Sequence, residues 1–136
     1  MLKISDLSNS KILVLGDVML DRFIDGHVSR ISPEAPVPIL EKSAVKQMPG
    51  GSANVACNVA FLGAKTTLIG AIGKDEAGQI LVTELDNNPS ITFMPHIVTG
   101  RPTTLKTRYR AAGQQILRVD DEDTSPLAAD AVKAIL

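Results

Sequence analysis

The sequence has little cysteine, few aromatic residues and no long apolar run, and each shortage excludes a class of protein. Cys57 is the only cysteine among 136 residues, so an internal disulfide is excluded and a reducing compartment suits the chain. Aromatic residues make up only 3% of the sequence, which argues against a base-stacking platform for nucleic acid. No apolar run approaches the roughly 18 residues of a membrane-spanning helix. With a formal net charge of −1, we expect a cytoplasmic protein with neither a nucleic-acid nor a membrane partner.

What remains is the composition of one soluble globular domain. Hydrophobic residues make up 44% of the chain and charged residues 21%, both close to the average for such domains. The length is also that of one domain. Because the sequence ends at Leu136 inside a predicted helix, we expect part of the domain to lie outside this chain.

Apolar runs alternate with helical patterns and predict a parallel α/β sheet. The run KILVL is typical of a strand covered on both faces, and SANVACNVAFL is apolar nearly all round, as in a buried helix. The predicted order is a strand at Lys11–Leu15, a helix at Ser52–Leu62, a strand at Thr66–Ile72, a helix at Asp75–Asp86 and a strand at Ile91–Val98. This β–α–β–α–β order predicts a doubly wound sheet with right-handed crossovers.

The remaining segments predict smaller features outside that sheet. Prolines 33, 36 and 38 favour an edge or a lid over a central strand. Residues Thr103–Ala111 and Gln115–Asp120 predict a hairpin that turns at residues 112–114. Ser125 followed by Pro126 predicts the start of a helix over Leu127–Leu136.

The most informative motif is Pro-Gly-Gly-Ser-Ala-Asn at residues 49–54. Gly50 and Gly51 let backbone approach a ligand closely, and the Asn54 amide can both donate to and accept from a sugar hydroxyl. The alternative is a tight turn before a helix. Asn58 lies one turn further on, where a hydrogen bond to neighbouring backbone is expected. The glycine pattern matches neither a Rossmann fingerprint, a P-loop nor a nucleophile elbow.

Asp17 and Asp21 follow the first predicted strand, at the edge where open α/β sheets bind ligands. Their carboxylates can accept hydrogen bonds from two sugar hydroxyls. The alternative is a turn-forming Asp17 and a surface Asp21 paired with Arg22.

Basic residues alternate along the predicted strand at 103–111. Lys106, Arg108 and Arg110 fall on one face, where an arginine fork can hold a phosphate. The alternative is a solvated strand face. His27 and His96 have no partner at metal-ligand spacing, so we predict no metal site.

Taken together, these motifs resemble the ribokinase-like sugar kinases, also called the phosphofructokinase-B family. Their signature is similar to Gly50-Gly51, Asn54, Gly63 and Gly73 here, with Ser52 as a minor departure. The phrases GDVMLDRFI, SRISPEAPVPI, PGGSANVACNVAFLGA and QQILRVDDED look like the heptose-7-phosphate kinase branch. That branch is often the first half of a bifunctional kinase and adenylyltransferase that makes ADP-heptose for lipopolysaccharide cores.

The resemblance implies a ribokinase-like fold in two units. The core would comprise residues 1–19, 49–100 and 121–136, and a small β-lid residues 20–48 and 101–120. The lid would close over the sugar phosphate and supply a homodimer contact. Seven substrate-binding residues are implied: Asp17, Asp21, Gly50, Gly51, Asn54, Arg108 and Arg110.

The resemblance also implies which parts of the machinery the chain lacks. The catalytic base and the transition-state turn of the family lie in a motif of the form D-T-x-G-A-G-D, which is absent from this sequence. We therefore expect no catalytic residue in this chain, ATP and Mg²⁺ bound mainly by residues outside it, and no activity from it alone. The alternatives are another ribokinase-like carbohydrate kinase and a non-catalytic sugar-binding or dimerisation module.

Overall fold

A computed structural model describes residue 8 and residues 10–136. Residues 1–7 and 9, which the sequence assigns to the core unit, lie outside the described residues. The elements in chain order are β1 (Lys11–Leu15), β2 (Val18–Ile31), β3 (Pro38–Gly51), α1 (Ser52–Phe61), β4 (Lys65–Ile72), α2 (Glu76–Asp86), β5 (Ile91–Ile97), β6 (Leu105–Ala111), β7 (Gln114–Asp121) and α3 (Ala129–Ile135).

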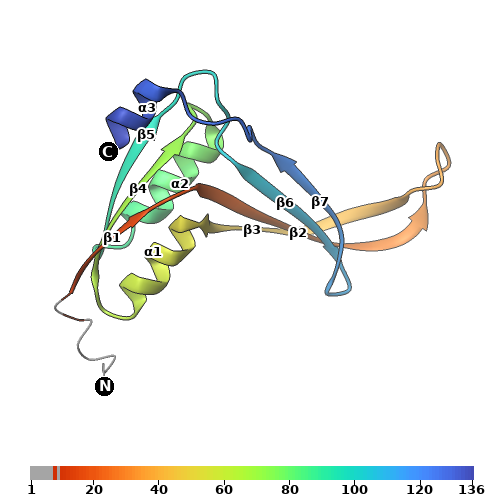
Figure 1. The fold of residues 1–136 in the computed structure, drawn as a ribbon. Coiled ribbons are helices and arrows are strands. Elements are labelled where there is room, and N and C mark those ends of the chain that lie inside the picture. Colours follow the sequence, from red (N-terminus) through yellow and green to blue (C-terminus); the bar gives the residue numbers. More distant parts are fainter. Residues whose placement is uncertain (1–7, 9) are drawn as a thin grey trace.

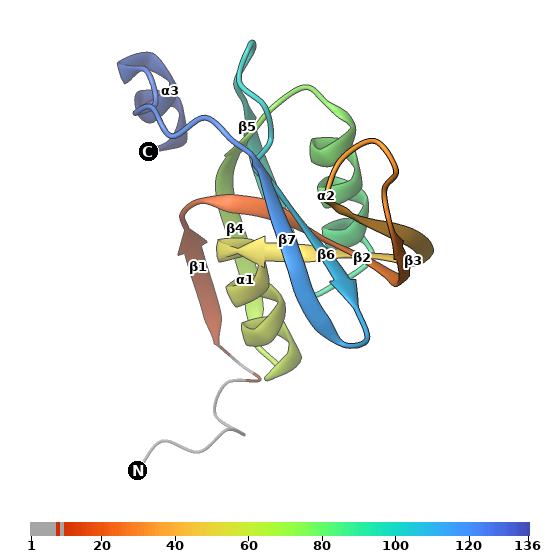
Figure 2. The same cartoon turned by 90° about the vertical axis from the view of Figure 1, so that its right-hand side faces the viewer.

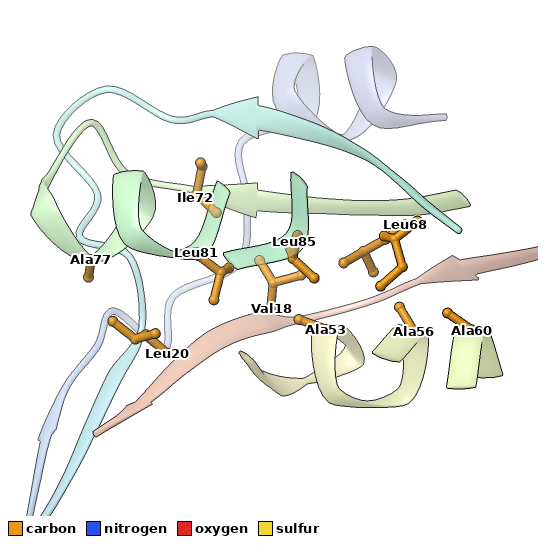
Figure 3. Close-up of a cluster of buried hydrophobic side chains, with 11 residues drawn as sticks. Val18, Leu20, Ala53, Ala56, Ala60, Leu68, Ile72, Ala77, Leu81 and Leu85 are labelled. Carbon is orange, nitrogen blue, oxygen red and sulfur yellow. The ribbon is translucent and has the colours of Figure 1, made fainter. Parts of the chain in front are cut away.

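Three of the strands form a parallel sheet in the order β1-β4-β5. Helices α1 and α2 provide the connections from β3 to β4 and from β4 to β5. The core lies where these helices meet the sheet and the first residues of β2, as Figure 3 shows. Leu20, Leu68, Leu81 and Leu85 are fully buried there. The parallel α/β architecture predicted from the sequence is confirmed.

The other four strands form a second sheet in the order β3-β2-β6-β7. Strand β2 pairs with β3 antiparallel and with β6 parallel, and β6 pairs with β7 antiparallel. This sheet extends away from the parallel sheet and its helices (Figure 1), and in Figure 2 it lies in front of them. Within the described residues, this sheet reaches the core at one end, where Val18 and Leu20 of β2 are buried and Leu105 of β6 packs against them.

Burial along β1 and α1 differs from the sequence prediction. Leu13 and Leu15 are 63% and 51% exposed, so β1 is not covered on both faces. In α1, Ala53, Ala56 and Ala60 are buried, whereas Phe61 is 90% exposed. Strand β1 and helix α1 therefore each have one side packed on the core and one exposed side. The reason is that α1 and α2 both pack against the same core.

The hairpin and the proline-rich segment were predicted correctly, and the start of the last helix was not. The β6–β7 turn contains Ala112 and Gly113 at φ 49° and 79°, the two positive values of a type I′ hairpin turn. Strand β3, which begins at Pro38, is an edge strand. Helix α3 starts only at Ala129, with Ala128 as an N-cap that makes no side-chain hydrogen bond. The Ser125 backbone N–H instead donates to Asp123 Oδ1 at 2.8 Å.

Candidate functional site

The four-stranded sheet has one polar and one apolar face, because side chains alternate along each strand and paired residues share a face. The polar face carries Asp21, Phe23 and Asp25 from β2 and Lys106, Arg108 and Arg110 from β6. The apolar face carries one continuous row across all four strands, made of Val45, Ile24, Tyr109 and Leu117. Most of the predicted site residues thus lie on or beside the polar face.

Asp17 and Gly51 come together where β1 passes into β2. The Ser52 backbone N–H donates to the Asp17 carbonyl at 2.9 Å, which ties the start of α1 to this turn. Gly51 has a φ of 57°, and a Cβ there would lie 2.5 Å from the Asp17 carbonyl oxygen. Only glycine satisfies both conditions.

Asp21 contacts both Gly50 and Arg108 of β6. Its carboxylate accepts a hydrogen bond from Arg108 Nη1, and a Cβ on Gly50 would lie 2.4 Å from Asp21 Oδ2. The alternative pairing of Asp21 with Arg22 is therefore wrong. Arg22 instead lies beside the Gln47 amide on the opposite face. Gly50 leaves room for the Asp21 carboxylate. Arg108, which lies 87 residues after Asp21 in the sequence, holds that carboxylate in place.

Arg110 lies two residues further along β6 and is paired with Asp25. Its Nε and Nη2 donate to the two carboxylate oxygens at 2.7 and 2.8 Å, a bidentate geometry. The hydrogen bond from Arg110 lowers the pKa of Asp25. Both guanidinium groups lie over the Phe23 ring, whose centroid is 5.3 Å from Arg108 Cζ and 4.8 Å from Arg110 Cζ. Both guanidinium groups are thus fixed by a carboxylate and an aromatic ring.

Lys106, the first basic residue of β6, is fully engaged by acidic residues. Its ammonium donates to Glu122 at 2.8 Å and to Asp120 at 3.0 Å. These hydrogen bonds, that of Glu122 first, raise the pKa of Lys106. Lys106 lies at the end of the polar face nearest the cavity. Because its ammonium group is already bonded to two carboxylates, it is less available to a ligand than the arginines.

Asn54 lies in the first turn of α1 and is exposed. Its Oδ1 accepts a hydrogen bond from Asn58 Nδ2 at 2.9 Å, so Asn58 bonds a side chain rather than the neighbouring backbone that the sequence predicted. This bond leaves the Asn54 amide N–H groups to donate to a ligand.

A cavity of about 570 Å³ continues the polar face toward the parallel sheet. Its wall includes Asp17, Met19, Thr104 and Glu122, together with Arg101. Arg101 Nη2 donates to the Ser125 carbonyl at 2.8 Å, which holds the segment before α3 against the cavity. This volume is typical of a small-molecule site.

Gly73, a glycine of the family signature, connects two segments of the fold. Its N–H donates to Thr103 Oγ1 at 2.8 Å, and Asp75 accepts from the backbone of Thr103 at 2.7 Å and of Gly78 at 2.8 Å. These bonds tie the start of α2 to the segment that leads into β6. The position of β6, and with it Arg108, depends on this connection.

Residues 9–135 match the family described as pfkB family carbohydrate kinase. The chain belongs to this family. The similar curated proteins include the "Bifunctional protein HldE" of Hyphomonas neptunium, 52% identical over 121 residues, and that of Gluconacetobacter diazotrophicus, 43% identical over 131 residues. These matches cover 89% and 96% of this chain, but the chain spans only about a quarter of the relatives' length (25% and 27%).

Solved carbohydrate kinases share the fold of this pfkB-family chain. A carbohydrate kinase from Agrobacterium tumefaciens is 25% identical with a TM-score of 0.67, over 82% of this chain and 35% of the other. A ribokinase from Cryptococcus neoformans in complex with ADP is 26% identical with a TM-score of 0.59, over 83% and 34%. The predicted ribokinase-like fold is confirmed. None of the helices in the described part of the chain is long and apolar enough to cross a membrane.

Several residues on the polar face were not predicted from the sequence. Phe23 and Asp25 of β2 alternate with Asp21 in the same period as the basic residues of β6, and this matching period is a signal that could have identified them. Lys46 and Arg118 could not have been found this way, because they reach the face through strand register, which the sequence does not reveal.

Proposed function

We propose that this chain is the acceptor-binding part of a kinase that phosphorylates heptose 7-phosphate. The intact kinase, meaning this chain with the residues that supply base and ATP site, would transfer the γ-phosphoryl group of ATP to the anomeric hydroxyl. The product would be the 1,7-bisphosphate used in ADP-heptose synthesis for lipopolysaccharide cores. Family membership and the phrases shared with the heptose branch support this choice.

The observation that carries the proposal is the arrangement of the polar face. Hydroxyl-binding groups lie at the end of this face nearest the cavity: Asp17 and Met19 line the cavity, and the Gly50-Gly51 turn lies against Met19, with Asp21 beside Gly50. Arginines lie further out, with Arg108 and Arg110 on β6. A sugar that carries a phosphate at the end remote from its anomeric carbon matches this order of groups. Asn54 would donate to a sugar hydroxyl from the start of α1.

The described residues offer no cluster of ligands for the metal ion, and the motif that the resemblance assigns to the catalytic base is not in this sequence. They contain no group of three or more His, Cys, Asp or Glu side chains placed to hold a metal ion, and the sequence has no D-T-x-G-A-G-D motif. We therefore assign the base, ATP and Mg²⁺ mainly to residues outside this chain. The residues of this chain would bind and orient the acceptor. Such positioning supplies much of the catalysis in phosphoryl transfer.

Calorimetric titration tests this division of labour. The 136-residue chain is titrated with heptose 7-phosphate and, separately, with Mg-ATP. Binding of the sugar phosphate without binding of Mg-ATP is the expected result. A chain that binds Mg-ATP and not the sugar phosphate would contradict the proposal. In the intact kinase, a preference for fructose or another unphosphorylated sugar would instead favour another branch of the family.

The apolar face of the four-stranded sheet supports a homodimer. Val45 and Leu117 are 47% and 54% exposed and lie at the two ends of the row that crosses the sheet through Ile24 and Tyr109. An apolar row in this position would be covered by the same row of a second copy, in an isologous contact. We expect Val45→Glu with Leu117→Glu to convert the dimer of the intact kinase to a monomer in sedimentation experiments.

We place the kinase in the cytoplasm, where ATP is available.

A further inference from the structure

One cross-strand row of the polar face carries three cations and no carboxylate. Strand pairing places Lys46 of β3 opposite Phe23 of β2, Phe23 beside Arg108 of β6, and Arg108 opposite Arg118 of β7. The adjacent rows contain carboxylates: Asp21 and Asp120 on one side and Asp25 on the other. Positive charge is therefore concentrated in the Phe23 row.

This concentration is unfavourable in the absence of an anion. Arg108 and Arg118 are direct cross-strand neighbours, and like charges in such positions destabilise a sheet. Their carboxylate partners lie in the neighbouring row, with Arg118 Nε 2.9 Å from Asp120 Oδ1, so each guanidinium is held at one side only. Asp120 is moreover shared with Lys106. Phe23 lies under Arg108 and attracts it through its ring face, but it carries no net charge that would neutralise the row.

We propose that Lys46, Arg108 and Arg118 form a recognition row for the phosphate monoester of the acceptor. This inference rests on the proposed function, since the phosphate is that of the proposed sugar. The row lies two strand residues beyond Asp21, or roughly 7 Å, so one ligand can contact Asp21 with a hydroxyl and the row with its phosphate. Arg108 would contribute its free N–H groups, Arg118 its outer nitrogens and Lys46 a mobile ammonium.

Substitution of Lys46 in the intact kinase tests the row. Lys46→Met keeps the length of the side chain and removes its charge, and Lys65→Met is the matched control, because Lys65 is an exposed lysine of β4 in the other sheet. We expect Lys46→Met to raise KM for heptose 7-phosphate about tenfold, the effect of one charged hydrogen bond, with kcat nearly unchanged. KM for the unphosphorylated heptose and the behaviour of Lys65→Met should both stay at the wild-type value.

Two outcomes separate the failure of this inference from failure of the proposed function. If the wild-type kinase uses heptose 7-phosphate and Lys46→Met changes KM for both sugars equally or for neither, the recognition row is wrong and the function stands. If the wild-type kinase does not use heptose 7-phosphate, the proposed function is wrong. Titration with inorganic phosphate, followed by NMR, then tests whether the recognition row binds phosphate. The Nε–Hε resonances of Arg108 and Arg118 should then shift in the wild type and not in Lys46→Met. Equal shifts in both proteins would overturn the row.

Discussion

At the scale of single residues, Gly50 is required by the position of the Asp21 carboxylate. A Cβ at residue 50 would lie 2.4 Å from Asp21 Oδ2 and 2.8 Å from Met19 Cγ, far inside van der Waals contact. Gly50→Ala should therefore displace Asp21 and raise KM of the intact kinase for the acceptor about tenfold, a loss of ~1.4 kcal/mol. Steady-state kinetics measure the effect.

A double-mutant cycle provides the control for Gly50→Ala. If the glycine acts through Asp21, Asp21→Asn should cost little more when residue 50 is already alanine, because both changes remove the same interaction. Fully additive losses in log KM would show that Gly50 acts in some other way. Thermal unfolding of each variant separates a binding defect from a general loss of stability.

Asn54 allows a second prediction for a single side chain. Its Oδ1 is occupied by Asn58, so its N–H groups are the ones offered to a hydroxyl. Asn54→Ala in the intact kinase should weaken acceptor binding by about 1–3 kcal/mol, the cost of unpaired polar groups. Calorimetry should show ATP affinity near the wild-type value. Equal losses of both affinities would contradict the division of the site argued above.

At the scale of elements, Asp75 joins the N-terminus of α2 to the segment that leads into β6. Burial alone would raise the pKa of Asp75, but the hydrogen bonds from Thr103 and Gly78 outweigh it and leave the pKa below its ordinary value of 3.8. Ionised Asp75 therefore stabilises the fold fully above that value. The stabilisation is lost as the pH falls through the lower pKa of the folded state.

Asp75→Asn tests this connection, because an amide has one acceptor oxygen where the carboxylate uses two. The variant should lose about 1–2 kcal/mol of unfolding free energy at neutral pH, and less of its remaining stability on acidification below pH 4 than the wild type. Denaturant titrations at several pH values measure both effects. The matched control is Glu76→Gln, an exposed residue in the same turn. An acid dependence unchanged by Asp75→Asn would assign the connection to other groups.

The elements themselves could be predicted from the sequence, but many of their contacts could not. The run KILVL has the composition of a strand, and Gly113 between two strand-like segments indicates a hairpin turn, so β1 and the β6–β7 hairpin were predictable. The local sequence pattern shows which side chains of a strand share a face, but not which other strand they contact. The contact of Arg108 with Asp21 therefore depended on register between strands that are far apart in sequence. The exposure of Leu13 was equally hidden, since composition does not show what covers a strand.

At the scale of the whole molecule, the parallel sheet has an open edge and an open apolar side. In the part of the chain that the structure describes, strand β1 pairs with β4 only, and Leu13 and Leu15 on β1 and Met94 on β5 are 63%, 51% and 55% exposed. In register, Leu15, Ile69 and Met94 form one row across this side. An unpaired strand beside such a surface is a template for association.

The 136-residue chain should therefore self-associate when it is studied alone. Light scattering after gel filtration should give a mass that rises with concentration over the micromolar range. Leu13→Lys with Leu15→Lys should reduce the association, because lysine on an edge strand opposes pairing with another chain. Phe61→Lys is the control, since Phe61 is 90% exposed but lies at the end of α1. A monomeric mass at every concentration, or equal effects of the two sets of substitutions, would show that the β1 surface does not drive association.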